Sequence, residues 1–197
     1  PWVSNGTSSG TFMLKDINTS SNNGSTGTAY SKHFIEYKGK MYFYAIGSTA
    51  ASYAIYETDG TTTGTSLFKS LDRVDEFIVK DNLLYFTCVN GPSVWTSDGT
   101  LSGTTQIATI PNGQLNNVAT CQMTIANNDL FFRVISSSVG SELFKLNSSN
   151  QLINVKDIWS GTSNGVNSNI FLVIKILEVY DNKVWFLGND GSSSGAM

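Results

Sequence analysis

The same seven-residue pattern occurs twice: Asp59-Gly60-Thr61-Thr62-Thr63-Gly64-Thr65 and Asp98-Gly99-Thr100-Leu101-Ser102-Gly103-Thr104. A third copy, Asn5-Gly6-Thr7-Ser8-Ser9-Gly10-Thr11, differs by Asn for Asp, and a fourth, which follows Phe144, has lost its glycines. An aromatic residue stands three positions before each copy. Self-similarity at a spacing of roughly 40–55 residues is typical of repeat architectures such as propellers and solenoids.

A second landmark recurs four times and in constant order with the first. It is a polar turn of Asn, Asp, Gly or Lys followed by an aliphatic residue and two aromatic residues. Such a pattern predicts a β-hairpin, because the turn needs residues that tolerate positive φ and the strand favours β-formers. The four copies are Lys38 to Phe43, Asp81 to Phe86, Asn127 to Phe132 and Asp181 to Phe186.

The two landmarks divide one repeat unit into four short strands. In the second unit we expect strands near 77–80, 84–89, 94–97 and 104–110, each rich in β-formers and bounded by Gly, Asn, Asp or Pro. The sequence therefore predicts an all-β chain, a β-propeller of four-stranded antiparallel blades, with about four blades. Residues 1–197 form a single propeller domain or a segment of a larger propeller, with units near 32–71, 76–110, 119–158, and 170–197 completed by 1–17.

Both ends of the sequence fall inside a repeat. Residues 1–17 match the third and fourth strands of a unit, and residues 170–197 match the first and second strands. One blade shared between the two ends would close a ring without leaving an open sheet edge. The alternative is a segment of a longer array, and we expect a fragment or processed piece rather than a complete gene product.

We interpret the Asp-Gly-Thr turns as structural. The Asp or Asn side chain can accept backbone N–H groups in an Asx turn. We expect the first glycine to adopt a backbone conformation that a Cβ atom would penalise, and the second to have the left-handed conformation before the outer strand starts. Calcium needs six or more oxygen ligands and each turn offers one carboxylate, so we expect no metal site. The predicted turn residues are Asn5, Gly6, Gly10, Asp59, Gly60, Gly64, Asp98, Gly99 and Gly103.

Aromatic residues recur at two repeat positions. Side chains at one place in successive blades are expected to pack blade against blade and supply most of the core. Exposed aromatics could instead form a platform for glycans, but repetition in every blade argues against that. The two sets are Trp2, Tyr56, Trp95 and Phe144, and Phe43, Phe86, Phe132 and Phe186.

The composition argues against several classes of function. A net charge of −3 without a basic cluster disfavours nucleic acid and anionic membranes, and no apolar run is long enough to span a bilayer. His33 is the only histidine, and the acidic residues are scattered, so no catalytic constellation is visible and we expect neither an enzyme nor a cofactor. Cys88 and Cys121 could meet across a blade interface, but two buried free thiols are the expected state.

The Asp-Gly-Thr-x-x-Gly-Thr spacing, with Leu14-Lys15-Asp16-Ile17 beyond the first copy, resembles the ELWxxDGT repeat family of bacterial surface and secreted proteins. The closest match to the Glu-Leu-Trp opening of that family is Glu142-Leu143-Phe144. The resemblance covers the whole chain. It implies β-propeller-like repeats in exported proteins of the extracellular space, cell surface or outer membrane, with roles in adhesion or surface assembly.

These observations lead to a non-catalytic interaction or scaffold module, with partners among other proteins of a surface or secretion assembly. The alternative is a glycan-binding or glycan-processing propeller. The irregular connectors, between the second and third strands and after the fourth, vary in length and are where a scaffold presents recognition loops. Their anchor-type side chains, and hence our predicted binding residues, are Tyr30, Arg73 and Trp159. Packing of Trp159 onto its own blade is the open alternative.

Overall fold

The computed structural model describes residues 1–19, 34–48, 53–88, 92–110, 122–166 and 177–192. Its regular elements in this part of the chain are all strands, in three four-stranded antiparallel sheets and two hairpins. Sheet I holds β3 (Phe34–Tyr37), β4 (Lys40–Ile46), β5 (Tyr53–Thr58) and β6 (Ser66–Ser70). Sheet II holds β7 (Val74–Lys80), β8 (Leu83–Cys88), β9 (Ser93–Ser97) and β10 (Thr105–Thr109).

Sheet III holds β11 (Met123–Ala126), β12 (Asp129–Ser136), β13 (Gly140–Leu146) and β14 (Leu152–Lys156). The N-terminal hairpin pairs β1 (Trp2–Val3) with β2 (Phe12–Met13), and the C-terminal hairpin pairs β15 (Glu178–Tyr180) with β16 (Lys183–Trp185). Within every sheet the strands pair in chain order, as an antiparallel meander does. The prediction of an all-β chain with repeated four-stranded antiparallel sheets is therefore confirmed.

The first-to-second turn of each unit has the backbone that the sequence predicts. Both central residues have positive φ, between 46° and 73°, in all four copies. Asn, Asp and Gly populate this region at low cost, and the resulting twist matches that of the flanking strands. The turns are Lys38-Gly39, Asp81-Asn82, Asn127-Asn128 and Asp181-Asn182.

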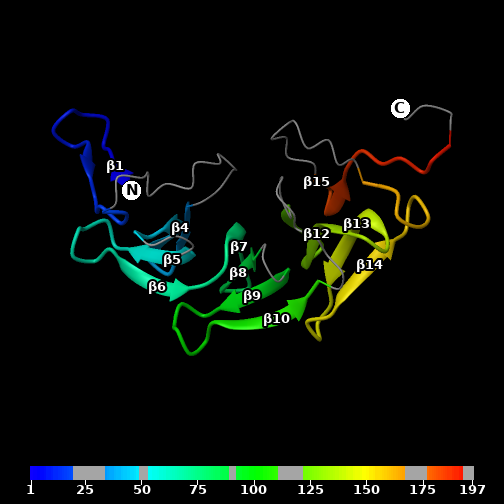
Figure 1. Cartoon of the computed structure of the whole chain (residues 1–197). Coiled ribbons are helices and arrows are strands. Elements are labelled where there is room, and N and C mark those ends of the chain that lie inside the picture. Colours follow the sequence, from blue (N-terminus) through cyan, green and yellow to red (C-terminus); the bar gives the residue numbers. More distant parts are fainter. Residues whose placement is uncertain (20–33, 49–52, 89–91, 111–121, 167–176, 193–197) are drawn as a thin grey trace.

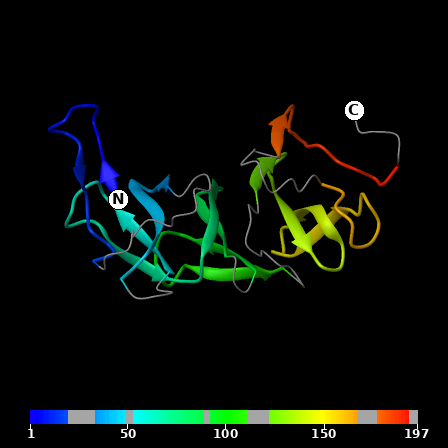
Figure 2. The ribbon, with the colours of Figure 1, turned by 45° about the horizontal axis from the view of Figure 1, so that its top comes forward.

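The sheets follow one another along an open arc (Figure 1). The N-terminal hairpin, in blue, lies at one end of the arc, and the C-terminal hairpin, in red, lies at the other. The second view keeps this arrangement, with sheets I, II and III between the two hairpins (Figure 2). In the described part of the chain the arc does not close into a ring, so the predicted closure is not seen here.

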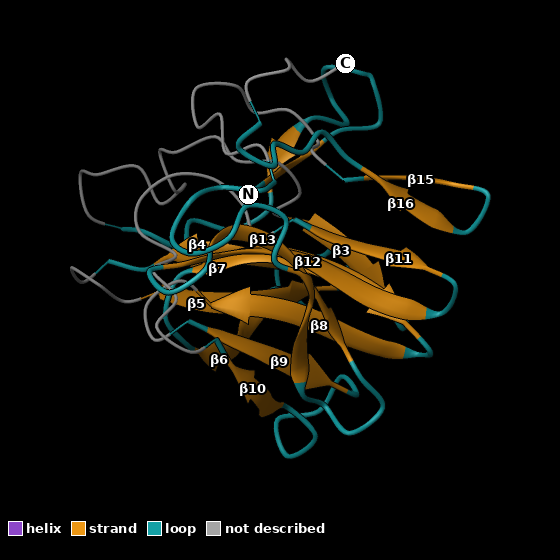
Figure 3. Ribbon diagram, turned by 90° about the vertical axis from the view of Figure 1, so that its right-hand side faces the viewer, coloured by secondary structure: helices purple, strands orange, loops and turns teal. Residues whose placement is uncertain are grey.

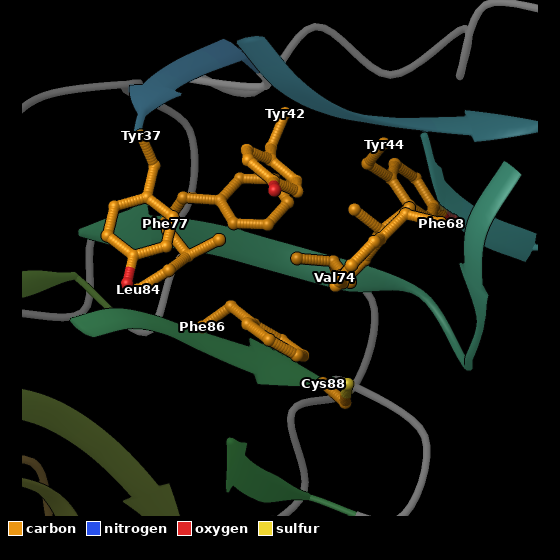
Figure 4. Packing of buried hydrophobic residues seen from close by; sticks show 10 residues of the cluster. Tyr37, Tyr42, Tyr44, Phe68, Val74, Phe77, Leu84, Phe86 and Cys88 are labelled. Atoms are coloured by element: carbon orange, nitrogen blue, oxygen red, sulfur yellow. The ribbon is translucent and has the colours of Figure 1, made fainter. Parts of the chain in front are cut away.

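Successive sheets pack face to face. One face of sheet II packs against sheet I, and its other face packs against sheet III. Figure 4 shows the layer between sheets I and II, where Tyr42, Tyr44 and their neighbours face Phe77 and Phe86. Alternation along β4 and β8 places Tyr42 on one face and Phe43 on the other. The members of this layer are Tyr37, Tyr42, Tyr44, Ile55, Phe68, Val74, Phe77, Leu84, Phe86 and Cys88.

The two aromatic sets predicted to pack blade against blade also meet inside a sheet. Phe43 stacks on Tyr56 at 5.8 Å between ring centroids, and Phe86 stacks on Trp95 at 6.1 Å. These residues are direct cross-strand partners on the second and third strands. The same residues also pack between sheets, since Phe86 and Trp95 lie in the layer shared with sheet I. Phe132 and Phe144 lie in the layer shared with sheet II. Lys69 of sheet I adds a cation 5.5 Å from the Trp95 ring.

Candidate binding surface

The strand ends define two sides of the molecule, which we call the turn side and the loop side. On the turn side lie the tight first-to-second turns and the Asp-Gly-Thr turns between third and fourth strands. The Lys38 ammonium of the first kind of turn donates to the carbonyl of Asp98 in the second kind, at 2.8 Å. Figure 3 shows the short turn of β15–β16 projecting at one end of the stacked strands. The loop side carries the connectors from second to third strands and from fourth strands onward.

On the turn side, the Asp-Gly-Thr turn satisfies its own polar groups. Asp59 Oδ1 accepts the Thr61 N–H at 2.9 Å and the Thr61 hydroxyl at 2.7 Å, and Thr61 Oγ1 accepts the Gly64 N–H. The hydroxyl of Thr65 donates to the Thr61 carbonyl and lies 2.7 Å from the hydroxyl of Thr58. The Thr61 hydroxyl and backbone N–H lower the pKa of the Asp59 carboxyl below its ordinary value.

The other two copies of this turn repeat the same pattern. Asp98 accepts the N–H and hydroxyl of Thr100 at 2.8 and 2.7 Å, and Asn5 accepts those of Thr7 at 3.0 and 2.7 Å. Asn and Asp are interchangeable here because both bonds go to one side-chain oxygen. This geometry uses the carboxylate within the turn rather than presenting it to a ligand.

The two glycines of the turn have different roles, and one expectation was wrong. The first glycine has φ near +90° in all three copies, as expected: Gly6, Gly60 and Gly99. The second glycine does not have positive φ. It is required by close approach, because a Cβ atom on Gly64 would lie 2.0 Å from Asp59 Oδ1. Gly10 and Gly103 face Asn5 and Asp98 in the same way.

The loop side holds two of the three predicted binding residues. Tyr30 lies outside the described residues. Arg73 is partly buried between sheets I and II, close to the Tyr44 phenol, whose pKa is raised by burial and lowered in part by the Arg73 charge. Trp159 follows sheet III and is also partly buried. Arg73 directly precedes β7 and Trp159 follows β14, and these two strands lie apart along the arc (Figure 1), so the structure does not bring Arg73 and Trp159 together.

The Trp159 ring is packed against another segment of the chain. A Cβ atom added to Gly191 would lie 2.6 Å from the indole nitrogen of Trp159, so the ring covers that glycine closely. The ring therefore lies over the segment around Gly191. The packing fixes the orientation of Trp159 and leaves part of its surface accessible.

A buried carboxylate holds the loop that carries Trp159. Glu142, in β13, has no exposed surface and accepts three backbone N–H groups: Gly165 at 2.8 Å, Ile158 at 3.2 Å and Trp159 at 3.5 Å. Gly165 permits this approach, because its Cβ would lie 2.2 Å from Glu142 Oε1. Sequence reasoning gave Glu142 no role in holding this loop. Its place at the start of the Glu-Leu-Phe opening was the available signal.

The same loop is also hydrogen-bonded to the start of β13. The Ser141 N–H donates to Asn164 Oδ1 at 2.9 Å, and the Val166 N–H donates to the Ser141 carbonyl at 2.7 Å. A Cβ atom on Gly140 would strike the Ser163 carbonyl. The loop after sheet III is therefore hydrogen-bonded to the loop-side end of β13.

Two side chains that the sequence analysis did not single out link neighbouring sheets. Glu76 of sheet II accepts the Met123 N–H of sheet III at 2.6 Å, and Gln122 accepts the Leu177 N–H, next to β15, at 2.9 Å. Met123 pairs with Phe132 and Leu177 stands one residue before the partner of Trp185, so the two contacts occupy equivalent repeat positions. They show that a polar residue before the first-strand core position joins one sheet to the next.

No group of three or more His, Cys, Asp or Glu that could hold a metal ion occurs within the described ranges. The same residues contain no helix with the length and apolar character needed to cross a membrane. Cys88 is a buried free cysteine, and burial raises the pKa of its thiol to about 12. Cys121 lies outside the described residues, so a bridge between the two stays untested.

Comparison with known proteins gives no further identification, since no family model and no curated protein matches this chain. The resemblance to the ELWxxDGT repeats therefore stays a hypothesis based on the quoted residues.

Proposed function

We propose that this chain is a non-catalytic interaction module with β-propeller architecture, part of a secreted or cell-surface bacterial protein of the ELWxxDGT type. In this architecture sheets I to III are blades, and the two terminal hairpins are halves of a further blade. Its role is to hold partner proteins of a surface assembly on a rigid scaffold. The loop side is the binding side, and no cofactor takes part.

The observation that supports this most is the loop held by Glu142. Three N–H bonds to a carboxylate without exposed surface fix residues 158–165 in one conformation. A loop ordered in advance costs less conformational entropy on binding than a mobile one. Partly accessible Trp159 is then a ready anchor, since aromatic residues are enriched in hot spots. The Asp-Gly-Thr turns, by contrast, use their polar groups internally.

The test compares partner recovery from native cell envelope by two variants of the chain. Arg73→Ala combined with Trp159→Ala removes the described anchors of the loop side. Leu101→Ala is the matched control, because Leu101 is an exposed apolar residue of the turn side. We expect the double variant to lose its partner and the control to keep it. The reverse result would contradict the assignment, and glycosidase treatment of the envelope separates a glycan partner from a protein.

A further inference from the structure

Several of the most exposed apolar residues among those described lie at the two ends of the arc. Tyr180, Trp185 and Leu187 of the C-terminal hairpin segment are 74%, 55% and 65% exposed. At the other end Trp2 is 69% exposed and Phe34 of sheet I is 54% exposed. Large exposed side chains in clusters mark an interaction surface rather than ordinary surface variation.

Each of these residues has equivalents that are covered where a neighbouring sheet is present. Phe34 corresponds to Phe77 and Met123, which are 2% and 4% exposed beneath the preceding sheet. Tyr180 corresponds to Tyr37, which is 3% exposed and donates its hydroxyl to the Asn82 carbonyl of the following sheet at 2.6 Å. The C-terminal hairpin thus resembles a sheet without its following neighbour, and sheet I resembles one whose preceding neighbour, the N-terminal hairpin, lacks its first two strands.

The strand registers show how the two hairpins fit together. In sheets I, II and III, Phe43 pairs with Tyr56, Phe86 with Trp95 and Phe132 with Phe144. By repeat position the next pair is Phe186 with Trp2, which places Val184 opposite Ser4. Among the described residues no strand lies along β1 on the side away from β2, or along β16 on the side away from β15. The two open edges are therefore complementary in register.

We infer that β16 of one copy of this chain pairs along β1 of a second copy, so that each joint is a four-stranded sheet in the order β15–β16–β1–β2. This inference rests on the propeller architecture proposed above and adds the identity of the partner. Trp185 and Leu187 then cover Phe34 of the second copy, and Tyr180 reaches Gly39, the equivalent of Asn82. Lys156 has the same repeat position relative to Trp2 of the second copy as Lys69 has relative to Trp95, whose ring it contacts.

A second copy fits better than the other end of the same chain. The hairpins lie at opposite ends of an open arc (Figures 1 and 2). The angle between sheets is held by contacts such as Tyr37 to Asn82, Glu76 to Met123 and Gln122 to Leu177. Closing one chain on itself would disturb these contacts, whereas a second arc completes the ring without doing so. Two copies supply six whole and two composite sheets, which makes eight blades, the upper end of the usual range.

The surface available is sufficient for a stable pair. With about 150–250 Å² for each large aromatic side chain, the five exposed residues at one joint hold on the order of 600 Å². A ring of two copies has two such joints, so the apolar side chains alone bring the buried area above the ~1,000 Å² expected of a specific interface. Backbone pairing of β1 with β16 adds to this.

The first experiment measures the mass of the 197-residue chain by sedimentation, with two charge variants. Trp185→Glu places a charge in the proposed joint, and Leu67→Glu is the matched control on the exposed, outer strand of sheet I. We expect a dimer for the unsubstituted chain and for Leu67→Glu, and a monomer for Trp185→Glu. Circular dichroism checks that all three remain folded. A monomeric unsubstituted chain, or a folded Trp185→Glu dimer, would overturn the inference.

The second experiment tests register and partner by disulfide formation between separate single variants. Ser4→Cys mixed with Val184→Cys should form a cross-linked dimer, since opposite residues on paired strands have suitable spacing. Ser4→Cys mixed with Lys183→Cys should not, because Lys183 is one residue out of register and points to the other face. Mapping by mass spectrometry separates these links from any link through Cys88 or Cys121.

A chain carrying both Ser4→Cys and Val184→Cys completes the design. If it forms the link within a monomer, the second copy is wrong and the chain closes on itself, while the propeller module of the proposed function stands. If no arm forms the in-register link, the shared blade is wrong as well. Neither result bears on partner recovery through Arg73 and Trp159, so the two proposals fail separately.

Discussion

Replacing Glu142 by Gln should destabilise the chain more than any other isosteric change in sheet III. Both carboxylate oxygens accept N–H groups, Oε1 from Gly165 and Trp159 and Oε2 from Ile158. A Gln side chain must direct its NH₂ group at one of these donors, which leaves a buried N–H unsatisfied at about 1–3 kcal/mol. The remaining bonds lose their ionic character, at roughly 1 kcal/mol more. The expected loss is about 2–4 kcal/mol.

Urea unfolding measures this loss, with Lys145→Met as the control. Lys145 lies three residues further along the same strand, and its ion pair with Asp129 at 2.8 Å is partly exposed on both sides. Such a pair contributes under about 1 kcal/mol. Hydrogen exchange at the Gly165 amide shows whether the loop opens locally before the sheet unfolds. Glu142→Gln within about 0.5 kcal/mol of the unsubstituted chain, with the Gly165 amide still protected, would refute the reasoning.

Three further changes have defined outcomes. Gly60→Val should cost about 1–2 kcal/mol or more in urea unfolding, because φ is near +90° although the space is open, and an unchanged midpoint would contradict this. Gly64→Ala should displace the Asp59 carboxylate, so an NMR titration should show the pKa of Asp59 rising toward its ordinary value. Burial raises the pKa of Cys88 from 9.0 to about 12, so the thiol ionises more readily unfolded than folded. Its contribution to stability should be complete below pH 9 and decline as pH rises toward 12, and Cys88→Ala should flatten that decline.

The parts of the fold that sequence reasoning predicted are those held by contacts close along the chain. The hydrogen bonds that close the Asp-Gly-Thr turn join residues two to seven positions apart, as between Asp59 and Thr61 or Thr58 and Thr65. Such contacts require particular residues at fixed short spacings, and these spacings are visible in the sequence. The strands of sheet II illustrate this: Val74–Lys80 and Leu83–Cys88 were expected near 77–80 and 84–89.

A β-bulge that recurs in the three sheets is a feature that the sequence pattern did not predict. In all three sheets the fourth strand has one extra residue opposite the step before the third-strand aromatic, for example between Ile55 and Tyr56. Such a bulge re-aims side chains on its strand. In sheet I it lets Phe68 reach the layer shared with sheet II. Strand propensity contains no signal for one extra residue, so the sequence predicted the strands and not the bulge.

The contacts between sheets join residues about one repeat apart, and a single sequence gives no direct sign of them. Glu76 is 47 residues from Met123, and Gln122 is 55 residues from Leu177. The repeat makes such a contact predictable once one copy is known, because the contact of Gln122 with Leu177 is the contact of Glu76 with Met123 shifted by one repeat unit. Not every contact between sheets repeats in this way. Tyr37 donates its hydroxyl to the Asn82 carbonyl, but Lys80 and Ala126 occupy the equivalent position in the next two units, so they cannot form this bond. A tyrosine stands at this repeat position again only at Tyr180, which is 74% exposed at the open end of the arc. A side chain that carries the bonding group of a buried equivalent, and lacks the neighbour that would bury it, is the strongest sign in this chain of a surface meant to be covered.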